Sequence, residues 1–166
     1  VIMEKIKTDV LVIGAGSGGL SVAAGAAQMG ASVVLLEGHK MGGDCLNFGC
    51  VPSKALLASA KMAYQQTKSG AFGVSDQVPQ VDYAAAKAHV ADVISQIEPM
   101  DSVERFEGFG VRVIQEYGHF ISPKVVQAGE HQITARRVVI ATGSSPLVPP
   151  ITGLEKGIKK KKGGFK

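Results

Sequence analysis

The stretch Gly14-Ala15-Gly16-Ser17-Gly18-Gly19 follows directly on an apolar run over residues 8–13. An apolar run without chain breakers is typical of a strand buried on both faces. In the spacing G-x-G-x-x-G, the first glycine permits a tight turn, the second lets a pyrophosphate approach the backbone, and the third allows close packing of helix on strand. A helix over residues 20–29 would then point its free N–H groups at the anion. The stretch predicts a strand–loop–helix unit that binds a dinucleotide.

A second strand and an acidic residue complete this unit. Residues 31–36 are again apolar, and Glu37 follows them. A carboxylate at this place can accept hydrogen bonds from both hydroxyls of an adenosine ribose, and it disfavours a ribose that carries a 2′-phosphate. Because strand, glycine loop, helix, strand and acid occur in this order, a glycine-rich turn without a ligand is the weaker interpretation. We expect an α/β fold with a parallel sheet.

The two cysteines of the chain lie shortly after this unit, in the run GGDCLNFGCVPSK over residues 42–54. Four residues separate Cys45 from Cys50, and Asn47 and Gly49 among them let the backbone turn tightly enough for the two sulfurs to bond. Pro52 suits the first turn of a helix, so Cys50 would lie at the positive end of that helix, where a thiolate is stabilised. The pair predicts a redox-active disulfide beside the nucleotide.

Two other uses of the cysteines are less well supported. A structural disulfide needs an oxidising compartment, and the N-terminal residues show no charged region followed by a long apolar one that would signal secretion. We therefore expect a cytoplasmic protein. Zinc needs closely spaced pairs of ligands, whereas the four histidines are scattered, so we expect no metal site. These histidines are His39, His89, His119 and His131.

Taken together, these motifs resemble the N-terminal FAD domain of the pyridine nucleotide-disulfide oxidoreductases, with lipoamide dehydrogenase and mercuric reductase as the most similar members. The resemblance rests on the glycine loop, Glu37, residues 42–54 and residues 141–146, and it covers about residues 5–154 in order. It implies a three-layer α/β domain of the Rossmann type, with a central parallel sheet and a small antiparallel β-meander. It also implies that the ligand of the glycine loop is FAD, which the glycines alone do not decide.

The resemblance also implies roles for individual residues. Cys50 would be the thiol that accepts electrons from the reduced flavin, Cys45 the thiol that meets the substrate, and Lys54 a neighbour of the flavin. Many members have threonine where this chain has Asp44, and an ionised carboxylate there would raise the pKa of the Cys45 thiol. The residues expected to contact the cofactor are Gly14, Gly16, Ser17, Gly18, Gly19, Glu37, Gly42, Gly43, Asp44, Lys54, Gly118, His119, Ala141, Thr142 and Gly143.

The activity implied by the resemblance is that of an NAD(P)H-dependent oxidoreductase. NADH or NADPH would reduce FAD, FAD would reduce the disulfide, and Cys45 would react with a small disulfide, dithiol or mercuric substrate. In this family a histidine of the partner subunit serves as acid and base, so the full-length protein is expected to be a homodimer. The alternative is a module that binds FAD or another nucleotide without catalysis.

The length of the chain indicates how much of such an enzyme is present. In this family, nicotinamide and dimerisation domains follow the FAD domain, and 166 residues leave no room for them. We expect residues 1–154 to form the FAD-binding domain and the chain alone to be inactive. Residues 155–166 contain six lysines and one glutamate, which accounts for the net charge of +4. We interpret them as a basic tail outside the fold and expect neither nucleic acid nor a membrane as a partner.

Between the motifs, the pattern predicts ordinary packing elements. A helix is expected from Pro52 to about residue 67, a loop over residues 69–79, and a second helix from residue 83 to about residue 106 with Asp82 as its cap. A strand over residues 111–117, a meander over residues 120–134 and a strand over residues 137–141 would complete the sheet.

Overall fold

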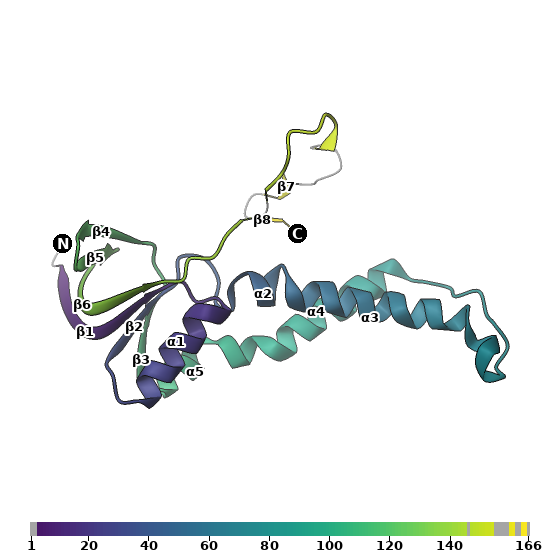
Figure 1. The fold of residues 1–166 in the computed structure, drawn as a ribbon, viewed down its shortest axis with the longest axis horizontal. Helices are drawn as coiled ribbons and strands as arrows, with labels where there is room; N and C mark the ends of the chain where they lie inside the picture. The colour runs from purple at the N-terminus through teal and green to yellow at the C-terminus, as the bar shows by residue number, and fades with distance from the viewer. Residues whose placement is uncertain (1–2, 146, 155–159, 162–163, 166) are drawn as a thin grey trace.

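The sheet of this protein has six strands in the order β3-β2-β1-β6-β5-β4 (Figure 1). We describe it from a computed structural model covering residues 3–145, 147–154, 160–161 and 164–165. Strands β3, β2, β1 and β6 are parallel, and β5 and β4 continue the sheet in antiparallel pairing. The strands are β1 (Glu4–Ile13), β2 (Val33–Leu36), β3 (Val111–Ile114), β4 (Gly118–Ser122), β5 (Val125–Ala128) and β6 (His131–Ile140).

Two apolar clusters form because successive side chains of a strand point to opposite faces. Leu11 packs in a cluster with Val126 and Ile133 of the meander, whereas its neighbour Val12 packs in a cluster with Leu20 and Phe106 of the helices. Both clusters are fully buried at their centres. The parallel strands are therefore the middle layer of three, which confirms the predicted α/β fold with its central parallel sheet and small meander.

Helix α1 (Ser17–Gln28) follows β1 after a three-residue turn and lies against the sheet. It begins three residues before the predicted start, so the last glycines of the loop belong to its first turn. A Cβ atom added to Gly19 would lie 1.8 Å from the carbonyl oxygen of Gly14. Only glycine permits this close approach of helix to strand.

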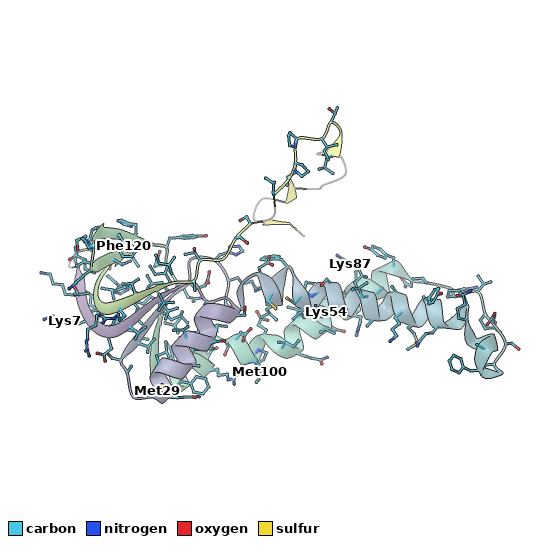
Figure 2. All side chains as sticks on the ribbon, viewed as in Figure 1. Lys7, Met29, Lys54, Lys87, Met100 and Phe120 are labelled. Carbon is cyan, nitrogen blue, oxygen red and sulfur yellow. The ribbon has the colours of Figure 1, made fainter. Side chains whose placement is uncertain are left out.

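Helices α3 (Cys50–Gln66) and α4 (Tyr83–Ile97) pack side by side and project away from the sheet (Figure 1). A short helix η1 (Ser69–Phe72) lies between them in sequence. The carboxylate of Asp82 accepts hydrogen bonds from the backbone N–H groups of Ala84 at 2.8 Å and Ala85 at 3.1 Å. These contacts confirm Asp82 as the cap of α4. Lys54 projects from α3 near the point where this pair of helices leaves the body (Figure 2).

The prediction of one continuous helix from residue 83 to about residue 106 is wrong. Helix α4 ends at Ile97, a short helix η2 (Glu98–Asp101) follows, and α5 (Val103–Gly108) begins anew. Pro99 causes the break, because proline has no N–H to donate and its ring clashes with the carbonyl four residues earlier. The Ser102 hydroxyl caps the new helix by accepting a hydrogen bond from the Arg105 N–H at 3.2 Å.

Two strand boundaries also differ from the prediction. Strand β3 ends at Ile114 rather than at residue 117, because the N–H of Glu116 turns back to the carbonyl of Ile114 at 3.0 Å. The last meander strand and the strand predicted over residues 137–141 are one continuous strand, β6. This long strand pairs with β5 through its first half and with β1 along its length, so it joins the meander to the parallel sheet.

Near the C-terminus, β7 (Lys160–Lys161) pairs with β8 (Gly164–Phe165) in antiparallel fashion. The rest of the predicted basic tail, residues 155–159, 162–163 and 166, lies outside the described residues. In the part of the chain that the structure describes, none of the helices combines the length and the apolar character needed to cross a membrane.

Candidate functional site

A cleft of about 790 Å³ opens where β1 and β6 end, and we call it the nucleotide cleft. Ligands of parallel α/β sheets bind at this edge, outside the carboxyl ends of the strands. The cleft gathers the glycine loop, the acid after β2, the start of the two-cysteine run and the segment after β6. Of the residues predicted from the sequence, it is lined by Gly14, Gly16, Glu37, Gly43, Asp44, Ala141, Thr142 and Gly143.

The floor of the nucleotide cleft is bare backbone. Gly14 has a φ of 106°, and a Cβ atom there would lie 2.3 Å from the carbonyl oxygen of Ala141. Gly43 has a φ of 57°, and its Cβ would lie 2.6 Å from the Cα of Gly16. No side chain caps α1 at Gly16. The first N–H groups of α1 are therefore open to an anion such as a pyrophosphate, with no side chain in the way.

Glu37 occupies the place in the cleft that the sequence predicted for the ribose acid. One carboxylate oxygen accepts a hydrogen bond from the Ala15 N–H at 2.7 Å. The other accepts from the N–H groups of His39 at 2.8 Å and Lys40 at 3.2 Å. These bonds fix the carboxylate beside the glycine loop. Carboxylate, bare glycine floor and helix N-terminus together fit the adenosine diphosphate half of a dinucleotide.

Not every predicted contact lines this cleft. Gly118 begins β4 and packs into the core, where its Cβ would lie 2.7 Å from a methyl group of Leu36. His119, next in the strand, also lies outside the cleft lining. Tyr117 lines the cleft instead, with its ring packed against Gly38. No local sequence signal identifies Tyr117 as a cleft residue, because its position depends on packing between distant segments.

The two cysteines lie on consecutive helices. Cys45 is half-buried in α2 (Gly43–Asn47), and Cys50 is the exposed first residue of α3. The side-chain amide of Asn47 donates to the carbonyls of Met41 and Gly43, both at 2.9 Å, which ties this single turn of helix together. The chain then reverses, because the N–H of Gly49 bonds back to the carbonyl of Asp44 at 2.7 Å. Both cysteines are free thiols in this structure.

The Cys50 side chain raises the pKa of the Cys45 thiol by favouring its protonated form. Burial adds to the rise in pKa, and the positive charge of Lys54 opposes it. The sequence predicted a raised pKa for Cys45 from the carboxylate of Asp44. The structure assigns the effect to Cys50 instead, because one carboxylate oxygen of Asp44 turns toward Gly49, 2.7 Å from the position of a Cβ there.

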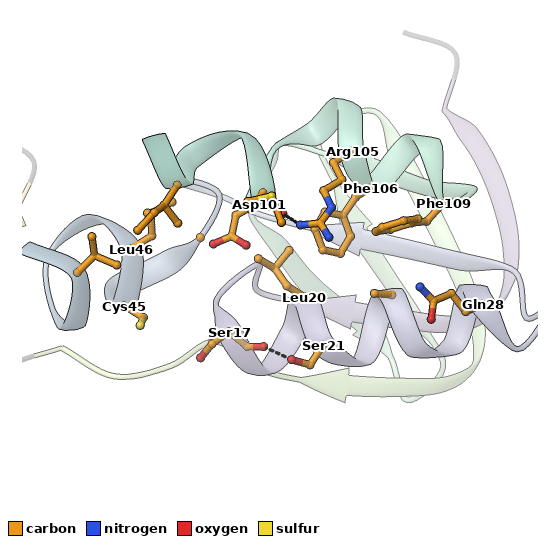
Figure 3. Close-up of a pocket in the computed structure, with 15 residues that line it drawn as sticks. Ser17, Leu20, Ser21, Gln28, Cys45, Leu46, Asp101, Arg105, Phe106 and Phe109 are labelled. Carbon is orange, nitrogen blue, oxygen red and sulfur yellow. Dashed lines mark hydrogen bonds between the residues drawn. The ribbon is translucent and has the colours of Figure 1, made fainter. Parts of the chain in front are cut away.

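A second hollow of about 400 Å³ is lined mainly by residues of α1, η2 and α5 together with Cys45 (Figure 3), and we call it the Cys45 groove. No residue lines both the Cys45 groove and the nucleotide cleft. Along the chain, however, residues of the groove lie directly next to residues of the cleft. Gly16, Gly43 and Asp44 line the cleft, whereas their direct neighbours line the groove. Those neighbours are Ser17, Gly42 and Cys45. A wall one backbone thick therefore separates the two hollows.

The state of the Cys45 thiol leads to a prediction for its alkylation. Because the Cys50 side chain raises the pKa of Cys45, less reactive thiolate is present near neutral pH. Replacing Cys50 with alanine removes this influence, so the pH profile for alkylation of Cys45 by iodoacetamide should move to lower pH. Rates measured by mass spectrometry from pH 6 to pH 10 test this. In Cys50→Ser, which can still accept a hydrogen bond, the shift should be smaller, and equal profiles for all three proteins would contradict the assignment.

Comparison with known proteins agrees with the geometry of the site. Residues 8–164 match the pyridine nucleotide-disulphide oxidoreductase family. The chain is 31% identical to a mercuric reductase of Lysinibacillus sphaericus over 148 residues, which are 89% of this chain and 27% of that protein. It is 35% identical to a dihydrolipoyl dehydrogenase of Acholeplasma laidlawii over 153 residues, 92% of this chain and 45% of that protein.

A solved structure shows the same fold. The HOCl-induced flavoprotein disulfide reductase RclA from Escherichia coli, solved as a Cu(II) complex, superposes with a TM-score of 0.71 at 24% identity. The match covers 89% of this chain and 31% of that one. The chain spans less than half the length of each of these three proteins. Since the family match extends over nearly all of its residues, the chain belongs to the pyridine nucleotide-disulphide oxidoreductase family.

Proposed function

We propose that this chain holds FAD in the nucleotide cleft and exchanges electrons through Cys45 and Cys50. It would do so as part of an NADH- or NADPH-dependent enzyme that acts on a small disulfide, dithiol or mercuric substrate. One observation carries the proposal: the two cysteines lie on consecutive helices, and their sequence neighbours Asp44 and Gly49 line a cleft that fits a dinucleotide. The relatives named above, two of which are mercuric reductase and dihydrolipoyl dehydrogenase, support the choice of substrates.

The residues of the nucleotide cleft would divide the binding of FAD among them. The open N–H groups at the start of α1 would face the pyrophosphate, and Glu37 would accept from the ribose hydroxyls. Thr142 and Gly143, after β6, would close the cleft on its other side. When bound, the flavin supplies the transfer of two electrons between a nicotinamide and a thiol pair. Gly14 and Gly43 keep side chains away from the floor.

The thiol pair would react with a substrate disulfide from the groove side of the wall. A Cys45 thiolate attacks one substrate sulfur, which forms a mixed disulfide and releases one substrate thiol. Cys50 then attacks the Cys45 sulfur, so that the Cys45–Cys50 disulfide forms and the second substrate thiol leaves. Two electrons pass from the pair to the substrate. Reduction of the Cys45–Cys50 disulfide restores the two thiols.

The raised pKa of Cys45 means that this reaction needs a base to accept its proton. The groove beside Cys45 contains no histidine among the described residues. We propose that the base comes from a second copy of the full-length protein, which would act as a homodimer.

Glu37 provides a test of cofactor choice. Replacing Glu37 with glutamine keeps the shape but removes the charged acceptor, so FAD affinity should fall by about 1–3 kcal/mol, or roughly 5- to 150-fold. Titration of the purified chain with FAD, followed by flavin fluorescence, measures the loss. NADP should compete poorly with FAD for the unaltered chain, because its 2′-phosphate meets the carboxylate.

The matched control is Glu116→Gln, an exposed glutamate after β3 that does not line the cleft. It should leave FAD affinity unchanged. If the Glu37→Gln chain and the unaltered chain bind FAD with equal affinity, Glu37 does not contact the cofactor. Binding of FAD without any oxidation of the thiols would favour a non-catalytic module.

A further inference from the structure

We propose that Asp101 makes the Cys45 groove select against substrates that carry negative charge near their reacting sulfur. This inference rests on the proposed function, because it assumes that Cys45 meets a thiol or disulfide substrate in this groove. The inference narrows the substrate class to molecules that are neutral or positively charged near the reacting sulfur.

The groove has the shape of a trough along α1. Ser17, Ser21, Ala24 and Gln28 lie four, three and four residues apart, so they share one face of the helix. Because three of these four side chains are small, the face leaves room along a helix that is about 18 Å long. The Ser21 hydroxyl donates to the Ser17 carbonyl at 2.7 Å, so it is already satisfied within the helix.

The opposite side of the groove is formed by η2 and α5 (Figure 3). The break at Pro99 separates these helices from α4, and Asp101 is the last residue of the short helix that results. Phe106 of α5 and Phe109, which follows it, contribute apolar surface, as does Leu46 on the side of Cys45. The mostly apolar trough thus contains the carboxylate of Asp101.

The carboxylate of Asp101 lies at the end of the groove that contains Cys45. One of its oxygens is 3.1 Å from the position of a Cβ atom on Gly42, a residue of the wall. Among the described residues it has no hydrogen-bond partner and no salt bridge, although burial raises the pKa of this carboxyl group. An ionised carboxylate without a partner repels a second anion placed beside it.

Arg105 does not neutralise Asp101 in an ion pair. Its guanidinium donates to the carbonyl of Met100 at 2.5 Å and lies 5.4 Å from the centre of the Phe109 ring, over its face. The positive charge of Arg105 does favour the ionised form of Asp101. The groove therefore has an acidic end beside Cys45, and the Arg105 guanidinium is held by Met100 of η2 and by Phe109, which follows α5.

The test measures how fast Cys45 reacts with disulfides that differ in charge. It uses the Cys50→Ser chain, in which Cys45 is the single thiol, with dithionitrobenzoate as the anionic, dithiodipyridine as the neutral and cystamine as the cationic disulfide. In Asp101→Asn, the rate with the anionic reagent, divided by the rate with the neutral one, should rise on the order of fivefold. The same ratio for the cationic reagent should fall by a similar factor.

Division by the neutral rate removes any change in the intrinsic reactivity of Cys45. Asp92→Asn is the matched control, because Asp92 is an exposed aspartate of α4 outside the groove, and its substitution should leave both ratios unchanged. If Asp101→Asn does not fold, salt provides a second measurement. Added salt should then speed the anionic reagent and slow the cationic one in the Cys50→Ser chain.

Ratios that do not change in Asp101→Asn, or that do not respond to salt, would overturn the role of Asp101. The proposed function would survive this result, since oxidation of the Cys45–Cys50 pair is measured separately. Failure of Cys45 to react with all three reagents would overturn the assignment of the groove to thiol and disulfide substrates.

Discussion

Replacing Gly14 with alanine is expected to lower the free energy of unfolding by about 3–5 kcal/mol and to abolish FAD retention. Two costs add at this position. The backbone has a φ of 106°, which residues with a side chain rarely adopt, and the new Cβ would meet the Ala141 carbonyl oxygen at 2.3 Å. Relief of the contact would push β6 away from β1 at the edge that forms the cleft. Urea unfolding followed by circular dichroism measures the first effect, and flavin content after purification measures the second.

The other glycines of the loop provide matched controls. A Cβ atom on Gly18 meets nothing within 4 Å, so Gly18→Ala should leave the free energy of unfolding within about 1 kcal/mol of the unaltered value. A Cβ on Gly16 would find only the Cα of Gly43, at 3.9 Å, so Gly16→Ala should fold normally and lose FAD affinity alone. Equal stability of Gly14→Ala and Gly18→Ala would show that the close approach to Ala141 is not structurally important.

Oxidation of the chain by diamide should convert both thiols into one intramolecular disulfide between Cys45 and Cys50. The reversal at Gly49 brings the start of α3 back onto α2, and the Cys50 side chain is near enough to raise the pKa of the Cys45 thiol. Titratable thiols should therefore fall from two per chain to none and return fully after reduction by dithiothreitol. Thiol titration and the mass of the peptide that contains residues 42–54 together measure this.

The Cys50→Ser chain is the comparison for this experiment. Its Cys45 has no partner within the chain, so diamide should leave a titratable thiol or link two chains to each other. The Cys50→Ser chain cannot form the intramolecular disulfide at all, so the two proteins should differ clearly in the number of thiols that remain titratable. Two thiols that remain free in the oxidised unaltered chain would exclude the proposed electron transfer through the pair.

The sequence was sufficient to predict features that depend on local backbone chemistry. The glycine loop, the carboxylate of Glu37 and the cap at Asp82 all lie where their residue types require them, because turns, close approaches and helix caps involve neighbours in the chain. The helix break at Pro99 also depends on local backbone chemistry and could have been predicted. The apolar stripe across residues 84–97 suggested that the helix continued, but the missing N–H of the proline decided where it ended.

Features that depend on packing between distant segments were beyond the sequence. The Cys45 groove exists because η2 and α5 pack opposite α1, and no local pattern announces that Asp101 and Cys45 share a hollow. For the same reason Tyr117, rather than Gly118 and His119, lines the nucleotide cleft. The turn after β3 decides which of these neighbours faces outward, and that turn depends on how the meander packs on the sheet.

The wall between cleft and groove has a consequence for how new substrate specificities can arise. Adjacent residues of the same segments line opposite hollows, so the Ser17 and Ser21 side chains can change on the groove side while Gly16 and Gly43 remain in place for the nucleotide. Substrate choice can thus diversify without rebuilding the cofactor site. Cys45 is the exception. It lines the groove and is coupled to Cys50, so it must be kept when substrate specificity changes.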